Sequence, residues 1–160
     1  MKVLFANIIL ALVLVSAVSA QTAVAESKKP VPQYDAELAK RLGADERGMR
    51  NYVLAILRTG PANITDKDVR AKLFQGHFAM INRLAGEGKL SVAGPLDDPK
   101  GEYRGIYVFN VATVEEAQKL TETDPSIKAG IFRVEFIKWY ASAGLMEVTN
   151  IHGRVQPPKP

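Results

Sequence analysis

Apolar positions between residues 52 and 139 recur with two periods, one typical of β-strands and one typical of α-helices. Four short segments are rich in β-branched and aromatic residues, which predicts strands at 52–58, 89–93, 104–111 and 131–139. Two segments between them space their apolar residues three or four positions apart, which predicts helices over 65–86 and 113–123. Thr65 and Thr113 are the expected N-caps of these helices.

The predicted elements follow the order strand, helix, strand, strand, helix, strand. This is the order of the ferredoxin-like βαββαβ fold, an α+β arrangement in which both helices cover one face of an antiparallel sheet. The first and third strands are central in that topology, and the second and fourth lie at the edges. Both predicted central strands are apolar on their two faces, whereas Phe132, Val134 and Phe136 share one face of the fourth.

The second apolar face of the sheet requires a cover, because the helices occupy only the first. Another copy of the chain is the simplest cover, since a two-fold interface needs only one self-complementary patch. We therefore predict a homodimer that forms through the sheet face.

The first twenty residues have the composition of a cleavable secretion signal. Lys2 precedes an apolar stretch from Val3 to Val15, which small residues follow as far as Ala20. The stretch is shorter than the roughly 20 residues that span a bilayer, so an uncleaved anchor is the weaker interpretation. We expect an exported protein, periplasmic or secreted, without a stable membrane anchor after cleavage.

The remaining chain divides into one domain and its flanking segments. We expect a linker at 21–34, a short leading helix within 35–51, the folded domain at 52–145 and a tail at 146–160. Lysine and proline without periodicity mark the linker, and prolines mark the end of the tail.

Composition excludes several classes of protein. The chain has no cysteine, which rules out a disulfide scaffold and a lipid-anchored lipoprotein. Its formal net charge of +4, or +3 without the signal that contains Lys2, is distributed among acids, so nucleic acid is not an expected partner. It shows no zinc-ligand spacing and no glycine-rich phosphate loop, so we expect neither a metal nor a cofactor.

Only two histidines are present, and His77 is the one with functional potential. It falls on the helical stripe of positions 69, 73, 80 and 84, which predicts a buried imidazole. Such a histidine is either a core residue with one hydrogen bond or a general acid or base. His152, near the proline-rich tail, is expected to be a solvated surface residue.

Asp124 is a second candidate, since an acid at a helix C-terminus is unfavourable without a partner. The pair Asp124-Pro125 is equally typical of an N-cap and the first residue of a new helical turn. Weaker motifs are Gly94-Pro95, a strand terminator, and Asp97-Asp98, a solvated loop. Trp139 and Tyr140 are interpreted as packing residues.

Several short motifs together resemble the YciI-related (YCII) domain family over residues 52–140. In chain order they are Gly76-His77, Gly88-Lys89-Leu90, Ala93-Gly94-Pro95, Val114-Glu115-Glu116-Ala117, Thr123-Asp124-Pro125, Ala129-Gly130 and Trp139. The resemblance implies a dimeric α+β barrel. It also implies that His77 and Asp124 form a catalytic dyad, in which the carboxylate orients the imidazole, and that Gly94 and Pro95 shape a substrate pocket.

Three functions are consistent with these residues. The first is an enzyme, a lyase, hydrolase or isomerase that uses His77 on a small organic substrate. The second is a non-catalytic homodimer that binds a small molecule, and the third is a purely structural dimer. The enzymatic hypothesis requires His77 and Asp124 to lie within hydrogen-bond reach beside an open cavity.

Overall fold

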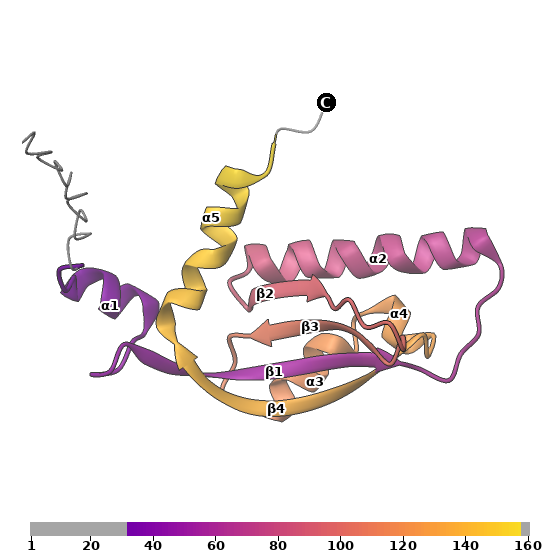
Figure 1. Cartoon of the computed structure of the whole chain (residues 1–160), viewed down its shortest axis with the longest axis horizontal. Helices are drawn as coiled ribbons and strands as arrows, with labels where there is room; N and C mark the ends of the chain where they lie inside the picture. Colours follow the sequence, from indigo (N-terminus) through magenta and orange to yellow (C-terminus); the bar gives the residue numbers. More distant parts are fainter. Residues whose placement is uncertain (1–31, 158–160) are drawn as a thin grey trace, which may run out of the picture. The chain divides into compact units, whose positions relative to one another are not determined.

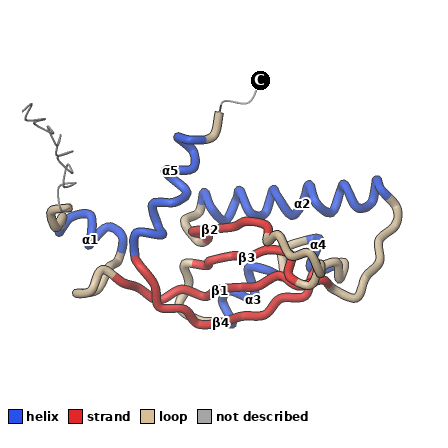
Figure 2. The backbone as a smooth tube through the Cα atoms, viewed as in Figure 1, coloured by secondary structure: helices blue, strands red, loops and turns tan. Residues whose placement is uncertain are grey.

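The computed structural model describes residues 32–157, which contain a four-stranded sheet and the helices around it (Figures 1 and 2). The strands are β1 (Met49–Thr59), β2 (Leu90–Pro95), β3 (Tyr103–Phe109) and β4 (Phe132–Ser142). The helices are α1 (Ala36–Leu42), α2 (Lys67–Gly86), α3 (Val114–Thr121), α4 (Pro125–Lys128), the 3₁₀ helix η1 (Ala143–Glu147) and α5 (Val148–Val155). The predicted secretion signal, residues 1–20, lies outside the described residues.

The sheet has the strand order β2-β3-β1-β4, and each neighbouring pair is antiparallel. This confirms the predicted α+β fold with β1 and β3 at the centre. The strand β1 pairs with β4 along its whole length, from Met49 opposite Ser142 to Thr59 opposite Phe132.

The sheet has an apolar cluster on each face. On one face Val53, Ala55 and Leu57 of β1 pack with residues from α2, α3 and α4, which form the main core. On the opposite face Tyr52 and Val108 pack against Leu145 and Met146 of η1. The chain therefore covers part of its own second face.

The helix N-termini explain where most helices begin. Thr113 and Glu116 form a reciprocal capping box at α3, as predicted. Asp35 caps α1 through the backbone N–H of Leu38. The prediction that Thr65 caps α2 is wrong, because the carboxylate of Asp66 accepts from the N–H groups of the first turn.

Other differences from the predicted elements are local. Gly94 and Pro95 are the last two residues of β2 and still pair with β3, so the strand does not end at Ala93. Val69, predicted on the buried stripe of α2, is 47% exposed, and the buried positions of this helix begin at His77.

The segment after β4 contains two helices where a tail was expected. Glu147, at the junction of η1 and α5, pairs with Arg41 of α1 at 2.6 Å. Thr149 of α5 lies at the edge strand β2, with its hydroxyl 3.5 Å from the carbonyl oxygens of Leu90 and Ser91. Within residues 32–157, no helix is both long enough and apolar enough to cross a bilayer.

Candidate active site

His77 lies in the second half of α2 and faces the sheet. It is buried, with only 7% of its surface exposed. Aromatic rings surround its imidazole at centroid distances of 5.4 to 6.1 Å. These rings belong to Phe74, Phe78, Tyr107 and Phe132. The ring of His77 is thus fixed in an aromatic environment with little access to water.

Asp124 lies between α3 and α4, immediately before Pro125, and is completely buried. Its Oδ2 lies 2.7 Å from Nδ1 of His77, and its Oδ1 accepts the N–H of Ser126 at 2.8 Å as the N-cap of α4. Because a carboxylate only accepts hydrogen bonds, this contact favours the tautomer with its proton on Nδ1 of His77. The structure therefore brings the two predicted dyad residues together, and Asp124 caps a helix as well.

Tyr107 of β3 completes this buried polar group. Its hydroxyl donates to Oδ2 of Asp124 at 3.1 Å and lies 3.2 Å from Nδ1 of His77. Burial, with the nearby Asp124 carboxylate, raises the pKa of the Tyr107 phenol well above its ordinary value. The hydroxyl therefore stays protonated, and it orients Asp124 without serving as a base.

A cavity of about 360 Å³ lies beside His77, which forms part of its wall. This volume lies within the usual range for sites that bind small molecules. Its walls are mainly apolar and are formed by residues that include Leu57, Phe74, Phe78, Ile81 and Phe132. Gly94 and Pro95 contribute to its wall, whereas Asp124 does not line it.

The second ring nitrogen of His77, Nε2, has no hydrogen-bond partner within residues 32–157. In the neutral imidazole with its proton on Nδ1, Nε2 carries a lone pair, and the side chain lines the cavity. This is the arrangement that a general base requires.

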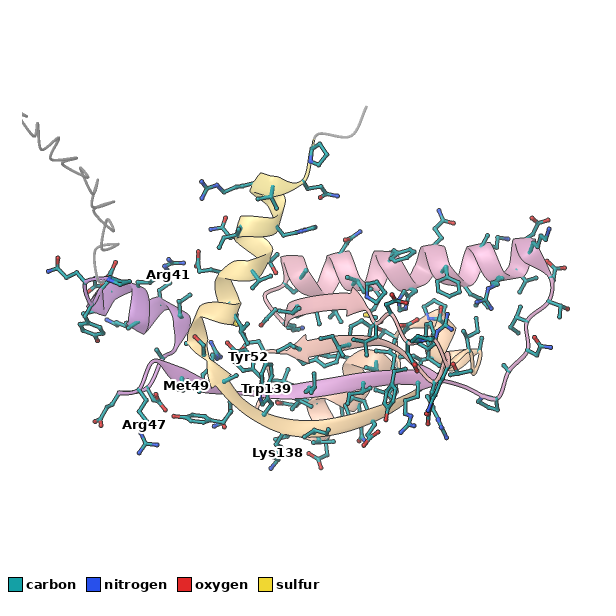
Figure 3. All side chains as sticks on the ribbon, in the orientation of Figure 1. Arg41, Arg47, Met49, Tyr52, Lys138 and Trp139 are labelled. Atoms are coloured by element: carbon teal, nitrogen blue, oxygen red, sulfur yellow. The ribbon has the colours of Figure 1, made fainter. Side chains whose placement is uncertain are left out.

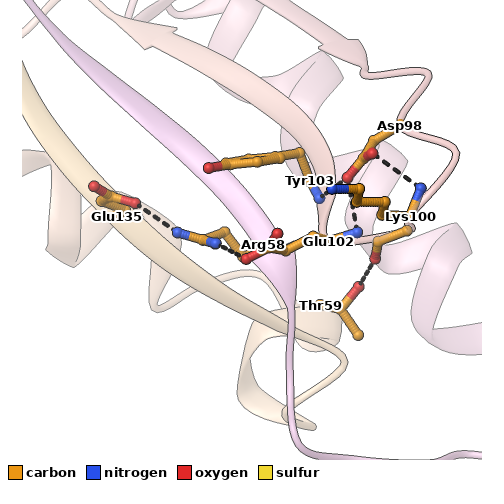
Figure 4. A network of polar contacts seen from close by, with 8 residues as sticks. Arg58, Thr59, Asp98, Lys100, Glu102, Tyr103 and Glu135 are labelled. Atoms are coloured by element: carbon orange, nitrogen blue, oxygen red, sulfur yellow. Dashed lines mark hydrogen bonds and ion pairs between the residues drawn. The ribbon is translucent and has the colours of Figure 1, made fainter.

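The other sequence candidates lie outside this site. Asp98 organises the loop before β3, where it accepts the N–H groups of Lys100, Glu102 and Tyr103 at 2.8 to 3.0 Å (Figure 4). These backbone hydrogen bonds, chiefly that from Tyr103, lower the pKa of Asp98. Among the described residues, no group of three or more His, Asp or Glu side chains is arranged to hold a metal ion. His152 is exposed on α5.

Tyr107 and the phenylalanines around His77 were not among the predicted site residues. Tyr107 could have been predicted from its place on the helix-facing side of a central strand, because a buried phenol needs a hydrogen-bond partner. The phenylalanines of α2 were missed because Phe74 and Phe78 do not belong to the stripe of positions 69, 73, 77, 80 and 84.

Comparison with known proteins gives the relationship directly. The family model described as the YCII-related domain matches residues 52–140, more than half of the chain. The chain belongs to the YCII-related domain family. This match covers the same residues as the motifs of the sequence and includes His77, Gly94, Pro95, Tyr107 and Asp124.

Two individual proteins are similar to this YCII-domain protein. The uncharacterized protein YjpA of Bacillus subtilis (strain 168) is 28% identical over 91 residues, which are 57% of this chain and 95% of YjpA. A solved structure of 5-chloro-2-hydroxyhydroquinone dehydrochlorinase (TftG) from Burkholderia phenoliruptrix AC1100, in complex with 2,5-dihydroxybenzoquinone, is 23% identical. That match covers 54% of this chain and 92% of TftG, with a TM-score of 0.41.

Proposed function

We propose that this YCII-domain protein is an enzyme in which His77 transfers a proton to or from a small, largely apolar ring compound. The observation that carries the proposal is the position of His77, whose Nδ1 is bonded to a buried carboxylate while the ring lines an open cavity. A lyase, hydrolase or isomerase reaction fits this arrangement, because each can proceed by proton transfer at one positioned base.

The roles of the residues follow from the contacts. Asp124 holds the imidazole in the tautomer that leaves Nε2 unprotonated and stabilises the charge that the ring gains when Nε2 takes a proton. Tyr107 donates to Asp124 and fixes the carboxylate. The backbone at Gly94 and the ring of Pro95 shape the wall against which the substrate lies.

The lining of the cavity indicates the class of substrate. Phe74, Phe78 and Phe132 provide flat apolar surfaces, which favour stacked or edge-on contact with a planar ring. The lining has three polar side chains, His77, Tyr107 and the cationic Arg104, and the other lining residues are apolar or glycine. We therefore favour largely apolar ring compounds such as hydroxybenzenes, halogenated hydroxybenzenes, quinones and cyclic ketones.

A non-catalytic binding protein is the alternative, and one observation favours it. Asp124 has a structural role as the N-cap of α4, so its contact with His77 could serve only to satisfy a buried polar group. In that case the cavity would bind a small molecule without changing it.

A screen followed by turnover assays separates the two functions. Thermal shift identifies compounds that bind, since a ligand at 100 times its dissociation constant adds about 2.7 kcal/mol of stability. Conversion of such a compound by the wild type, lost in His77→Gln with binding retained, supports the enzyme. Binding of several compounds without conversion of any would favour the binding protein.

We also propose a homodimer. It would form through the exposed part of the outer sheet face, which is the face opposite the main core. Ile137 and Trp139 are 43% and 39% exposed there, and Leu54 and Ile56 of β1 lie on the same face. Trp139 lies beside Tyr52, with ring centroids 6.3 Å apart (Figure 3). Arg58, near one end of β1, forms ion pairs with Glu102 and Glu135, so its charge already has partners within the chain (Figure 4). An apolar patch that includes a tryptophan is typical of a protein interface.

Export completes the proposal. A secretion signal at 1–20 would place the enzyme in the periplasm or outside the cell, where its substrates differ from those of cytoplasmic proteins. Sequencing of the N-terminus of the protein purified from its native host tests this, and a chain that still begins at Met1 would contradict it.

A further inference from the structure

Gly76 occupies the interior of the 20-residue helix α2, where glycine is an unfavourable residue. In a helix interior it is less favourable than alanine by about 1 kcal/mol, because it loses more backbone freedom. Gly76 has no positive φ angle to account for it. The reason for a glycine at this position must therefore be the space around it.

That space is occupied by Pro125, the first residue of α4. A Cβ atom on residue 76 would lie 2.6 Å from Cγ of Pro125, closer than such atoms approach in proteins. The proline ring is joined to its own backbone and cannot rotate out of the way. A second contact links the same two helices, because the hydroxyl of Ser126 donates to the carbonyl of Leu73 at 3.3 Å.

The residues next to this contact are the two members of the dyad. His77 follows Gly76, and Asp124 precedes Pro125, so the approach of α2 to α4 also sets the distance between the imidazole and the carboxylate. An ordinary contact at Pro125 would require a separation larger by roughly 0.8 Å. A similar increase would lengthen the 2.7 Å bond between His77 and Asp124 to about 3.5 Å, which is too long for a hydrogen bond.

We propose that Gly76 is a positioning residue, whose missing side chain allows α2 to approach Pro125 closely enough for His77 to bond Asp124. The importance of this for catalysis rests on the proposed function. The positioning itself is a property of the folded protein and is measured without a substrate.

The test is the Nδ1 proton of His77 in a ¹⁵N-labelled protein. A proton held between an imidazole and a carboxylate exchanges slowly and resonates downfield of the amide protons, and the His77→Gln variant assigns it. We expect this signal in the wild type and its loss in Gly76→Ala, together with a lower melting temperature.

Two further variants make the result specific. Gly86→Ala is the matched control, because Gly86 ends the same helix and nothing lies within 4 Å of its added Cβ; it should keep the signal and the melting temperature. Replacing Pro125 by Ala removes the ring atoms that an alanine at 76 would meet, so Gly76→Ala with Pro125→Ala should restore the signal.

Three results would overturn the proposal. They are an unchanged Nδ1 signal in Gly76→Ala, a signal that stays lost in the folded double variant, and a double variant that does not fold. If Gly76→Ala alone fails to fold, the double variant decides. A restored signal in a protein that converts no compound would reject the proposed function and leave the positioning role intact.

Discussion

Asp124 accepts a hydrogen bond from Nδ1 of His77 at 2.7 Å across 47 positions of sequence. Its other carboxylate oxygen accepts the N–H of Ser126 and so caps α4. One buried side chain therefore links the N-terminus of the short helix α4 to the imidazole on α2. This double role allows the structural and the chemical contributions of Asp124 to be separated by mutation.

Asp124→Asn should keep the fold and change the tautomer of His77. Asparagine caps helices about as well as aspartate, but its NH₂ group cannot accept the hydrogen bond from Tyr107, so the free energy of unfolding should fall by about 1 kcal/mol. The new NH₂ group would donate to Nδ1 and move the imidazole proton to Nε2, which lowers any turnover by roughly 10²- to 10⁴-fold. Long-range ¹H–¹⁵N correlation spectra report the tautomer.

The control for this variant is Asp66→Asn, which alters another aspartate N-cap outside the site. It should leave the tautomer of His77 unchanged. Asp124→Ala removes the cap and strands the partners of the carboxylate, which should cost roughly 2–4 kcal/mol. An asparagine variant whose His77 keeps the wild-type tautomer would show that Asp124 does not set it.

Tyr107→Phe should lower the free energy of unfolding near neutral pH and make that free energy fall less steeply at alkaline pH. Loss of the hydroxyl removes a hydrogen bond to Asp124 and should cost about 1 kcal/mol near neutral pH. Burial, together with Asp124, raises the pKa of the folded phenol, so above about pH 10 only the unfolded phenol ionises. The unfolded state then binds fewer protons than the folded state, and the free energy of unfolding falls as pH rises.

Urea unfolding at about pH 9 and about pH 11 measures this difference. The fall in stability between the two values should be smaller in Tyr107→Phe than in the wild type. Tyr34→Phe is the control, because Tyr34 is 80% exposed, and its curve should match the wild type. Equal pH dependence in all three proteins would mean that Tyr107 ionises freely in the folded state.

Trp139→Lys should convert the expected dimer to a monomer. The substitution places a charge in the exposed apolar patch on the outer sheet face, where desolvation of that charge would oppose association. Size-exclusion chromatography with light scattering at micromolar concentration gives the mass. Val155→Lys, on a residue of α5 that is 70% exposed, is the control and should remain dimeric. A monomeric wild type would refute the dimer.

Strand order and the contact between His77 and Asp124 were accessible from the sequence for different reasons. The central strands are apolar on both faces, and in the structure each face contributes to its own apolar cluster. His77 and Asp124 belong to short motifs of a family, so they could be named before their distance was known. Their roles in catalysis stay predictions.

The features that were missed depend on tertiary contacts. Tyr107 follows the alternation of an ordinary apolar strand residue, and only the approach of α2 and α4 gives its hydroxyl partners. The helix α5 contains Thr149, Asn150 and Gly153, whose helix propensity is low, so local sequence does not indicate it. Its link to the rest of the fold is tertiary, through Thr149 beside Leu90 and Ser91 of β2.

Exchange of carbon-bound hydrogen in D₂O shows whether His77 transfers protons in the cavity. A cyclic ketone that binds the wild type is incubated with wild type, His77→Gln and His152→Gln, and deuterium incorporation next to its carbonyl is followed by NMR. We expect equal incorporation by wild type and His152→Gln, and a rate at least about 100-fold slower with His77→Gln, in line with the usual contribution of a general base of about 10²-fold or more. Incorporation at the wild-type rate by His77→Gln would contradict proton transfer by His77.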